Sequence, residues 1–588
     1  MFLHSAFAVE KSVCHKLCLA PEDSLTMKFS IILFLILCIV HCFDGNESFE
    51  DKKNKFVGDE EKDFNKKFAL PKDVVVIGAG MAGLAAARRL TTDKTNFTVN
   101  IYEARRERFG GRVWTDKLAN PRAKGPEVDL GAFSLTAAGK NNPLFELAAD
   151  LGLKSVSLGE LQLLIPWEKR VVIGTDLDTV FSETSKILEL AMNESKASKI
   201  EMSVREAVDA VISNGKVQLS DSASSYLIQS SRPYLLDYSG KYPQSFQLGF
   251  AHKKVLLDGM GELTDRLLSG DLDEPPLHLG LNKAARQIKI DKKRNKVVVR
   301  FTDGSQVIAD AVVVAVPLSI ISSGDLQFEP FLPKAYYEAA KEMGITWENR
   351  VIVEFDHAFW PQEIGMFVRA VQAEEEMGHL QVWFNINQIV GVPALSGYLG
   401  GKAAEAFEKL SDEEAEKAVL SVLLEMFGES LLSQGGKVVR LQRSAWISDS
   451  WSKGAATYPK VGSSPSMWDI FAEPICPGVY FAGEHTSFVD HGTVHGAYVS
   501  GLRAASQIMG DLCEQKRLEQ EERERKQREA EMAKKEKETS GTGTIERSVC
   551  RQRKEKISIN IIGSPIPAAF HLLTKKQTPT QAKSHIDT

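Results

Sequence analysis

A β-branched run leads directly into a glycine-rich turn, and this junction constrains the fold more than any other feature of the chain. Residues 74–77 read VVVI, and an alanine-rich segment follows over 82–90. The turn between them has the pattern GxGxxG and consists of Gly78, Ala79, Gly80, Met81, Ala82 and Gly83. A buried strand before this pattern and a helix after it are the context in which it holds a dinucleotide. The junction therefore predicts a Rossmann-type β–α–β unit.

Each glycine has its own task in such a turn. Gly78 permits the tight turn, Gly80 lets the backbone approach a pyrophosphate, and Gly83 lets helix and strand pack closely. The start of the helix, which includes Met81 and Ala82, offers unpaired N–H groups and the positive end of a dipole. We therefore expect this segment to hold the phosphates of a cofactor.

Glu103 follows a second predicted strand, over 97–101, and lies 20 residues beyond Gly83. An acidic residue at this place in a β–α–β unit accepts hydrogen bonds from the ribose hydroxyls of the cofactor. A charge on the protein surface is the alternative interpretation.

Three short segments further on favour FAD over NAD. They read EAR at 103–105, GGR at 110–112 and DLGA at 129–132. Together they resemble the flavin amine oxidase family, which includes polyamine oxidases, monoamine oxidases, L-amino-acid oxidases and lysine-specific histone demethylases. The resemblance implies that Arg105 and Arg112 lie against the phosphates and ribityl chain, a task that suits the donor fork of guanidinium. The cofactor-binding residues implied in the third segment are Gly131 and Ala132.

A second half of the cofactor site is predicted about 400 residues later. Residues 477–486 (PGVYFAGEHT) indicate a strand and a glycine turn, and 493–501 (TVHGAYVSG) indicate the start of a helix. This block resembles the C-terminal flavin signature of the polyamine oxidase and histone demethylase branch. The resemblance implies that Glu484 contacts the ribityl or pyrophosphate region. It also implies that Thr493 and Val494 begin a helix whose positive end faces the pyrimidine edge of the isoalloxazine.

The stretch that begins at Trp446 is similar to the family segment that passes beside the flavin. Asp449, Trp451 and Gly454 complete the pattern. The resemblance implies that Trp451 packs near the flavin ring, as part of the catalytic site. A tryptophan that belongs only to the core is the alternative.

The sequence departs from the family at the position of a lysine that is bridged by water to flavin N5. In the family this lysine follows an asparagine in a strand, and the matching stretch here, 349–355, reads NRVIVEF. Arg350 therefore occupies the catalytic position. Arginine remains charged and cannot release a proton, whereas burial can tune a lysine. We expect Arg350 to stabilise reduced flavin or superoxide by charge alone; a surface or ion-paired arginine is the alternative.

A second departure concerns the aromatic cage that holds the amine in many members of the family. The cage tyrosine is replaced by Ala456, and the facing wall is Thr493, where monoamine oxidases have an aromatic residue. A cage of this kind steers and desolvates the amine, so its loss argues against a monoamine oxidase pocket. Tyr458 is a candidate for compensation.

Strand-rich and helix-rich blocks alternate along the chain, which favours two domains threaded through one another. The expected fold class is α/β, with a Rossmann-type, glutathione-reductase-like FAD-binding domain interleaved with an α+β substrate-binding domain. The FAD-binding parts are predicted at 71–135, 246–318 and 441–512, and the substrate parts at 136–245 and 319–440. A polar linker over 43–70 and a charged helical extension with a disordered tail over 513–588 flank them.

The first 42 residues are expected to be a signal peptide. The apolar run over 29–40 has the length of a signal core and is short for a membrane span. A start at Met27 and an uncleaved anchor, which would place the protein on a membrane, are the alternatives. The expected location is outside the cell or in the lumen of the secretory pathway. Three glycosylation sequons agree with this route, at Asn46, Asn96 and Asn193.

Composition excludes several other classes. A net charge of −6 gives no sign of a nucleic-acid partner. The cysteine and histidine spacing suggests no metal site, and an odd number of cysteines beyond the signal segment argues against a disulfide scaffold.

These features together predict an FAD-dependent amine oxidase. The expected substrate is a polyamine-like amine, which would become an imine while O2 is reduced to hydrogen peroxide. Arg350 and Ala456 leave a rival open. In that alternative the chain holds FAD but has lost or altered its catalysis, and acts as a binding or structural protein.

Overall fold

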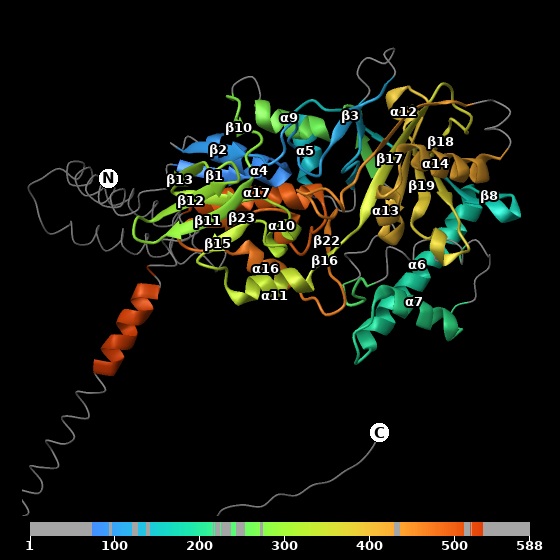
Figure 1. Ribbon diagram of the computed structural model, residues 1–588. Coiled ribbons are helices and arrows are strands. Elements are labelled where there is room, and N and C mark those ends of the chain that lie inside the picture. The colour runs from blue at the N-terminus through green and yellow to red at the C-terminus, as the bar shows by residue number, and fades with distance from the viewer. Residues whose placement is uncertain are drawn as a thin grey trace, which may run out of the picture. The chain divides into compact units, whose positions relative to one another are not determined.

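The computed structural model describes most of the expected catalytic region and part of the C-terminal extension (Figure 1). The signal peptide, the linker over 43–70 and most of the tail lie outside the described residues. The described ranges are 73–92, 97–119, 127–136, 142–215, 237–242, 253–270, 274–428, 436–510 and 520–532, with residues 217, 224 and 518.

A five-stranded parallel sheet contains the predicted β–α–β unit. Its strands, in spatial order, are β10(His278–Gly280), β2(Thr98–Tyr102), β1(Asp73–Ile77), β14(Ala311–Val314) and β23(Val479–Phe481). Apart from the exposed Asp73 at the start of β1, the central strands β1 and β14 consist of buried apolar residues, because both faces of the sheet are covered. The sheet therefore joins three segments of the chain that are far apart in sequence.

Helices cover one face of this sheet, and a second sheet covers the other. Val74 and Val76 of β1 pack with the helices α4(Met81–Thr92), α9(Gly261–Ser269) and α17(Val494–Met509). Val75 and Ile77 pack on the opposite side. The elements there are the sheet β13(Gln306–Ala309), β12(Lys296–Phe301), β11(Ala285–Asp291) and β15(Gln327–Glu329), with α10(Leu318–Ser322), α11(Lys334–Glu342) and α16(Ser466–Ala472).

A seven-stranded mixed sheet lies to the right of these elements in Figure 1. Its strands, in spatial order, are β21(Val438–Arg443), β17(Glu348–Phe355), β20(Ala394–Gly400), β19(His379–Asn385), β18(Ile364–Arg369), β7(Glu160–Ile165) and β8(Arg170–Val172). The expected fold class, α/β with two interleaved domains, is confirmed. The exact domain boundaries remain predictions, and β21 extends across the one placed at 440.

Alternation along β17 aims two sets of side chains at two different environments. Val351 and Val353 pack on α14(Asp412–Phe427), which together with α13(Gly401–Glu408) covers one face of the sheet. Glu348 and Arg350 have the opposite parity and face the interior between the two sheets. The period of two in a strand thus places both charged residues on the side of the cavity described below.

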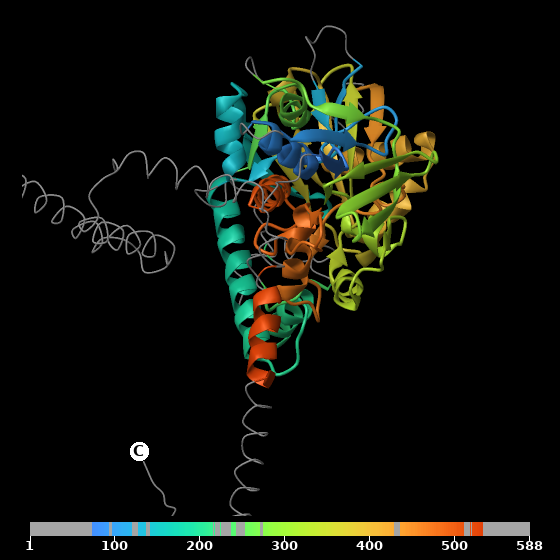
Figure 2. The same cartoon turned by 90° about the vertical axis from the view of Figure 1, so that its left-hand side faces the viewer.

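The stretch 136–245, predicted as the first substrate part, contains both helices and strands. Its helices are α5(Pro143–Asp150), α6(Gly174–Ala197) and α7(Val204–Ser213), and Figure 2 shows α6 along one side of the unit. The strands β6(Ser155–Ser157), β7 and β8 were not predicted, because β7 ends in three consecutive buried apolar residues, which periodicity alone does not assign to a strand. The remaining elements are β3(Thr115–Lys117), β4(Glu127–Asp129), β5(Leu135–Thr136), β9(Lys253–Leu256), β16(Gly344–Ile345), β22(Thr457–Tyr458), α12(Asn387–Val390), η1(Pro166–Glu168), η4(Glu374–Glu376) and η5(Glu484–Thr486).

The described part of the C-terminal extension forms a separate unit. Residues 520–532 are helical and exposed on all sides, and Lys526 pairs with Glu522 at 2.8 Å. Among the described residues, none of the helices has the length and apolarity that crossing a membrane requires. Cys476, just before β23, takes part in a disulfide.

Candidate active site

A cavity of about 730 Å³ opens between the two sheets, within the range of about 300–1,000 Å³ that is usual for cofactor and ligand sites. It is lined by β1, the start of α4, β17 and β20 of the second sheet, and the start of α17. Of the predicted site residues, Gly83 alone is absent from the wall. Those in the wall are Gly78, Gly80, Met81, Ala82, Glu103, Arg105, Arg112, Gly131, Ala132, Arg350, Trp451, Glu484, Thr493 and Val494.

The three glycines of the turn are needed for different reasons. Gly78 has a φ of +100°, and a Cβ on Gly83 would lie 2.0 Å from the carbonyl oxygen of Gly78. Both positions are therefore fixed by the packing of the protein itself. Gly80 differs, since a Cβ there would meet no protein atom closer than 3.8 Å and would occupy the cavity wall. Its lack of a side chain leaves room for a ligand, as expected where a backbone cradles a pyrophosphate.

Glu103 is buried beside this turn and is not a surface charge. Its carboxylate accepts a hydrogen bond from the Ala79 N–H at 3.0 Å and another from the Arg105 N–H at 2.9 Å. Only 4% of the residue is exposed, and it lines the cavity. The carboxylate oxygens keep further acceptor capacity on the cavity side.

The two arginines of the N-terminal half-site both reach across to the C-terminal half. Arg105 Nη2 donates to Asp449 at 2.7 Å and to the Ser452 hydroxyl at 2.9 Å. Arg112 Nη1 donates to Glu484 Oε1 at 2.9 Å and to the Ala455 carbonyl oxygen at 2.7 Å. These contacts lock the two half-sites into one wall, and they use part of each donor fork.

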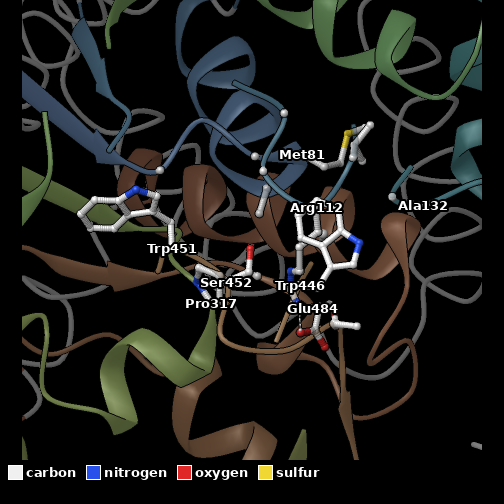
Figure 3. A pocket seen from close by; sticks show the side chains of 18 of the residues that line it. Met81, Arg112, Ala132, Pro317, Trp446, Trp451, Ser452 and Glu484 are labelled. Carbon is white, nitrogen blue, oxygen red and sulfur yellow. Dashed lines mark hydrogen bonds and ion pairs between the residues drawn. The ribbon is translucent and has the colours of Figure 1, made fainter. Parts of the chain in front are cut away.

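Glu484 is the point at which the largest number of these contacts meet. Its Oε2 accepts hydrogen bonds from the Thr457 hydroxyl at 2.6 Å and from the Gly492 N–H at 2.8 Å. Figure 3 shows Glu484 facing Arg112 at the wall of the cavity. Burial by itself would raise the pKa of Glu484, but the charge of Arg112 and these hydrogen bonds lower it to about 2. The carboxylate is therefore ionised at every ordinary pH.

Two helices direct their N-termini at the cavity. Thr493 caps α17, because its hydroxyl accepts a hydrogen bond from the Gly496 N–H at 3.0 Å. The first residue of α4, Met81, lines the same space. The positive ends of both helix dipoles favour negative charge on a bound cofactor.

Trp451, which was predicted to pack near the flavin ring, and Trp446 of the same segment occupy different settings. Trp451 is partly buried and lines the cavity, so it does not belong only to the core. Trp446 is 6% exposed, and its indole N–H donates to the Leu130 carbonyl oxygen at 3.2 Å. Figure 3 shows both side chains at the cavity. Arg108, which we did not predict, stacks on Trp114 with 4.7 Å from Cζ to the ring centre.

Arg350 is neither on the surface nor ion-paired in the described part of the chain. The residue is 8% exposed, and Nη1 donates to the Ser396 hydroxyl at 2.8 Å. Its Cζ lies 4.3 Å from the ring centre of Phe133. Burial lowers the pKa of Arg350 to about 10, against the opposing charges of Tyr398, Asp129 and Glu348, so the side chain is still cationic at neutral pH.

Three wall residues near Arg350 were not identified from the sequence. They are Phe133, Glu348 and Tyr398. Glu348 was accessible to prediction, because it lies two residues before Arg350 on one strand and therefore shares its face. Phe133 follows the DLGA segment directly, and no signal short of the strand register reveals that Tyr398 pairs with Arg350.

Tyr458 does not replace the missing cage tyrosine. It is absent from the described wall of the cavity, whereas Ala456 and Thr493 are part of it. The Tyr458 hydroxyl donates to Asp237 at 2.5 Å, and its ring stacks on Tyr238 with the ring centres 4.5 Å apart. Where a cage would have aromatic walls, this cavity therefore has an alanine and a threonine.

The fold and the cavity are those of an FAD-binding flavoprotein. Residues 81–509 match the sequence model of the flavin containing amine oxidoreductases, and the chain belongs to this family. FAD is its cofactor, and the cradle at Gly80, the buried Glu103 and the two helix N-termini fit such a group.

Relatives in this family include plant enzymes. Polyamine oxidase 3 of Oryza sativa subsp. japonica is 29% identical, over 76% of this chain and 90% of its own length. Polyamine oxidase 2 of Arabidopsis thaliana is also 29% identical, over 76% of this chain and 89% of its own. A solved structure of putrescine oxidase bound to putrescine has the same fold. Its TM-score is 0.59 at 20% identity, over 75% of this chain and 99% of that one.

We predict that Gly80→Val abolishes FAD binding without unfolding the protein. The Cβ of the valine would meet no protein atom closer than 3.8 Å and would lie at the cavity wall. The purified wild type should be yellow, with about one FAD per chain, and the variant should be colourless with an unchanged circular dichroism spectrum. Gly83→Ala is the control for packing, because its Cβ would overlap the backbone, and it should lose folded structure. Normal FAD content in Gly80→Val would refute the cradle.

We predict that Glu484→Gln destabilises the protein at neutral pH and that its effect fades in acid. The folded pKa of about 2 lies below the unfolded value of about 4.3. The carboxylate therefore stabilises the fold above about pH 4.3, and the contribution is lost as the pH falls towards 2. Loss of one member of a buried ion pair typically costs about 3–5 kcal/mol.

Urea unfolding of the wild type and the variant between pH 3 and pH 7 measures this difference in the free energy of unfolding. The exposed Glu413, which pairs with Lys417 on α14, provides a matched control, and Glu413→Gln should have little effect. A difference between wild type and Glu484→Gln that is constant over this range would contradict the assignment.

Proposed function

We propose that the protein oxidises a polyamine-like amine to an imine, which water hydrolyses, while O2 accepts the electrons and becomes hydrogen peroxide. Membership of the amine oxidoreductase family and the polyamine oxidases among its relatives support this proposal. The observation that carries it is the single cavity in which both FAD half-sites meet the charged face of β17.

When bound, FAD supplies the acceptor for a hydride. The residues of the chain prepare the amine for this loss. The apolar and aromatic parts of the wall, among them Ala132, Trp451 and Ala456, exclude water from the amine. The fixed charge of Arg350 disfavours an ammonium ion nearby and so favours the neutral amine that can lose a hydride.

Arg350 also affects the negative charge that is present in the cavity after the amine has been oxidised. Its guanidinium stays protonated, because even the lowered pKa of about 10 is well above neutral pH. It therefore stabilises negative charge in the cavity by electrostatics and exchanges no proton with it. The N-terminus of α17 acts in the same direction.

Two features of the wall favour a second candidate, an FAD-holding protein with lost or altered catalysis. Ala456 and Thr493 leave the amine without an aromatic cage, and Tyr458 is held by Asp237. Arginine in place of lysine removes a route for protons. Such a protein would act through binding.

We predict that anaerobic mixing with polyamines bleaches the flavin absorbance, and that monoamines bleach it more slowly. The oxidation removes electrons from the amine, so a reduced flavin accumulates when O2 is absent. Chemical reduction with dithionite is the control for an intact cofactor. If dithionite bleaches the flavin and none of the amines does, the second candidate is correct and the oxidase proposal fails.

We propose that the protein reaches the secretory pathway. The apolar run over 29–40 supports this, as does the disulfide at Cys476, because disulfides persist in oxidising compartments. Asn193 lies exposed on α6, where a glycan can be attached.

We predict that an N-glycosidase lowers the apparent mass of the protein made in a eukaryotic host. Asn193→Gln should remove part of this shift, because it destroys the sequon on α6. Asn214 is an exposed asparagine outside any sequon, so Asn214→Gln is the matched control and should leave the shift in apparent mass unchanged. An unshifted protein that fractionates with the cytosol would overturn the location.

A further inference from the structure

The Arg350 side chain has hydrogen-bonding capacity that the described protein does not use. Its Nη1 donates to the Ser396 hydroxyl at 2.8 Å. Among the described residues, Nε and Nη2 have no acceptor, and neither nitrogen is sealed from solvent. Arg350 lines the cavity, so a ligand there is an available acceptor for these two donors.

Aromatic rings fix the plane of this guanidinium. Its Cζ lies 4.3 Å from the ring centre of Phe133, 5.4 Å from that of Phe384 and 5.9 Å from that of Tyr398. Rings packed on the group hold it by cation–π contact and leave an edge of the fork for a ligand. The Nε–Nη2 edge carries two parallel N–H bonds, and the separation of these donors matches that of the two oxygens of a carboxylate.

The charge of Arg350 has no counter-ion in the described part of the chain. Asp129 and Glu348 act on it through space but form no ion pair with it. The oxygens of Asp129 are occupied by the Thr115 hydroxyl and the Met260 N–H, and burial raises the pKa of Asp129 to about 7. Buried charges in proteins are normally paired, so this cation can gain an anionic partner from the cavity.

We propose that Arg350 forms a monoanion subsite, in which the Nε–Nη2 edge binds a carboxylate side-on inside the cavity. Two kinds of ligand would present such a carboxylate. One is a free small acid, and the other is an amine substrate that carries a carboxylate of its own. In both cases the ligand shares the cavity with the proposed amine site. Anion binding requires no turnover, so the subsite stands or falls independently of the oxidase activity.

The test is a titration of the FAD-loaded protein with acetate and with its neutral isostere, acetamide. We expect saturable acetate binding, seen as a change in the flavin spectrum and a rise in the melting temperature. Acetamide should bind at least tenfold more weakly, because hydrogen bonds from the charged fork to a carboxylate are stronger than those to a neutral amide. Equal binding of the acid and the amide would overturn the subsite.

Variants locate the binding. Arg350→Met removes both the charge and the fork, and should weaken acetate at least tenfold. Arg350→Lys keeps the charge but presents no fork, and its affinity for acetate should lie between those of the wild type and Arg350→Met. This variant still tests the subsite if Arg350→Met fails to hold FAD. Arg294→Met, at an arginine whose side chain is 75% exposed, is the matched control and should bind acetate like the wild type. Unchanged acetate affinity in both Arg350 variants would refute the proposal.

The source of the carboxylate follows from a second pair of ligands, 6-aminohexanoate and 6-aminohexanamide. If the substrate carries the carboxylate, the amino acid binds more tightly than both its amide and acetate. If the anion is free, the amino acid binds like acetate, and acetate inhibits the oxidation of polyamines. Either result supports the subsite. Failure of all amines to bleach the flavin would count against the oxidase alone.

Discussion

The buried carboxylate of Glu484 joins chain segments that are far apart in sequence, and the site depends on it. It pairs with Arg112 from the first half-site and accepts hydrogen bonds from Thr457 and Gly492 in the second. A buried ion pair gains little stability over an apolar contact of the same shape, but it specifies geometry, because a misplaced partner leaves a charge without compensation. The ion pair of Arg105 with Asp449 likewise connects the first half-site to the second.

The cavity combines two kinds of electrostatic environment. Around the glycine turn and the start of α17, backbone N–H groups and helix dipoles provide diffuse positive potential, which suits phosphates and an electron-rich ring. On β17 the charges are discrete, with Glu348 and Arg350 on one face. Diffuse potential comes from the fold and tolerates substitution, whereas discrete charge depends on single side chains. The electrostatics of the cavity are therefore changed most easily by single substitutions on the strand, where Arg350 lies.

The sequence was informative wherever chemistry and local structure coincide. The apolar run of β1, the glycines of the turn and the start of α17 predicted the β–α–β unit and the pyrophosphate cradle. They could do so because the steric reason for these glycines lies in their own turn. Residues whose role depends on distant pairing could not be found. Tyr398 reaches the wall through its register with Arg350, and Tyr458 is diverted by Asp237, more than 200 residues earlier. The strand β7 was missed because the buried apolar run at its end fits a helix as well as a strand.

The strand order of the five-stranded sheet also bears on how the protein is made. Among the described strands, β23 is the last to leave the ribosome, yet it lies beside β14, which in turn lies beside β1, the first of them. During synthesis the early strands must wait with one neighbour missing, and a sheet of such high contact order forms slowly. The cofactor cannot be enclosed until the α17 segment has emerged. Because FAD binds the folded chain, its presence when synthesis ends stabilises the completed sheet by mass action.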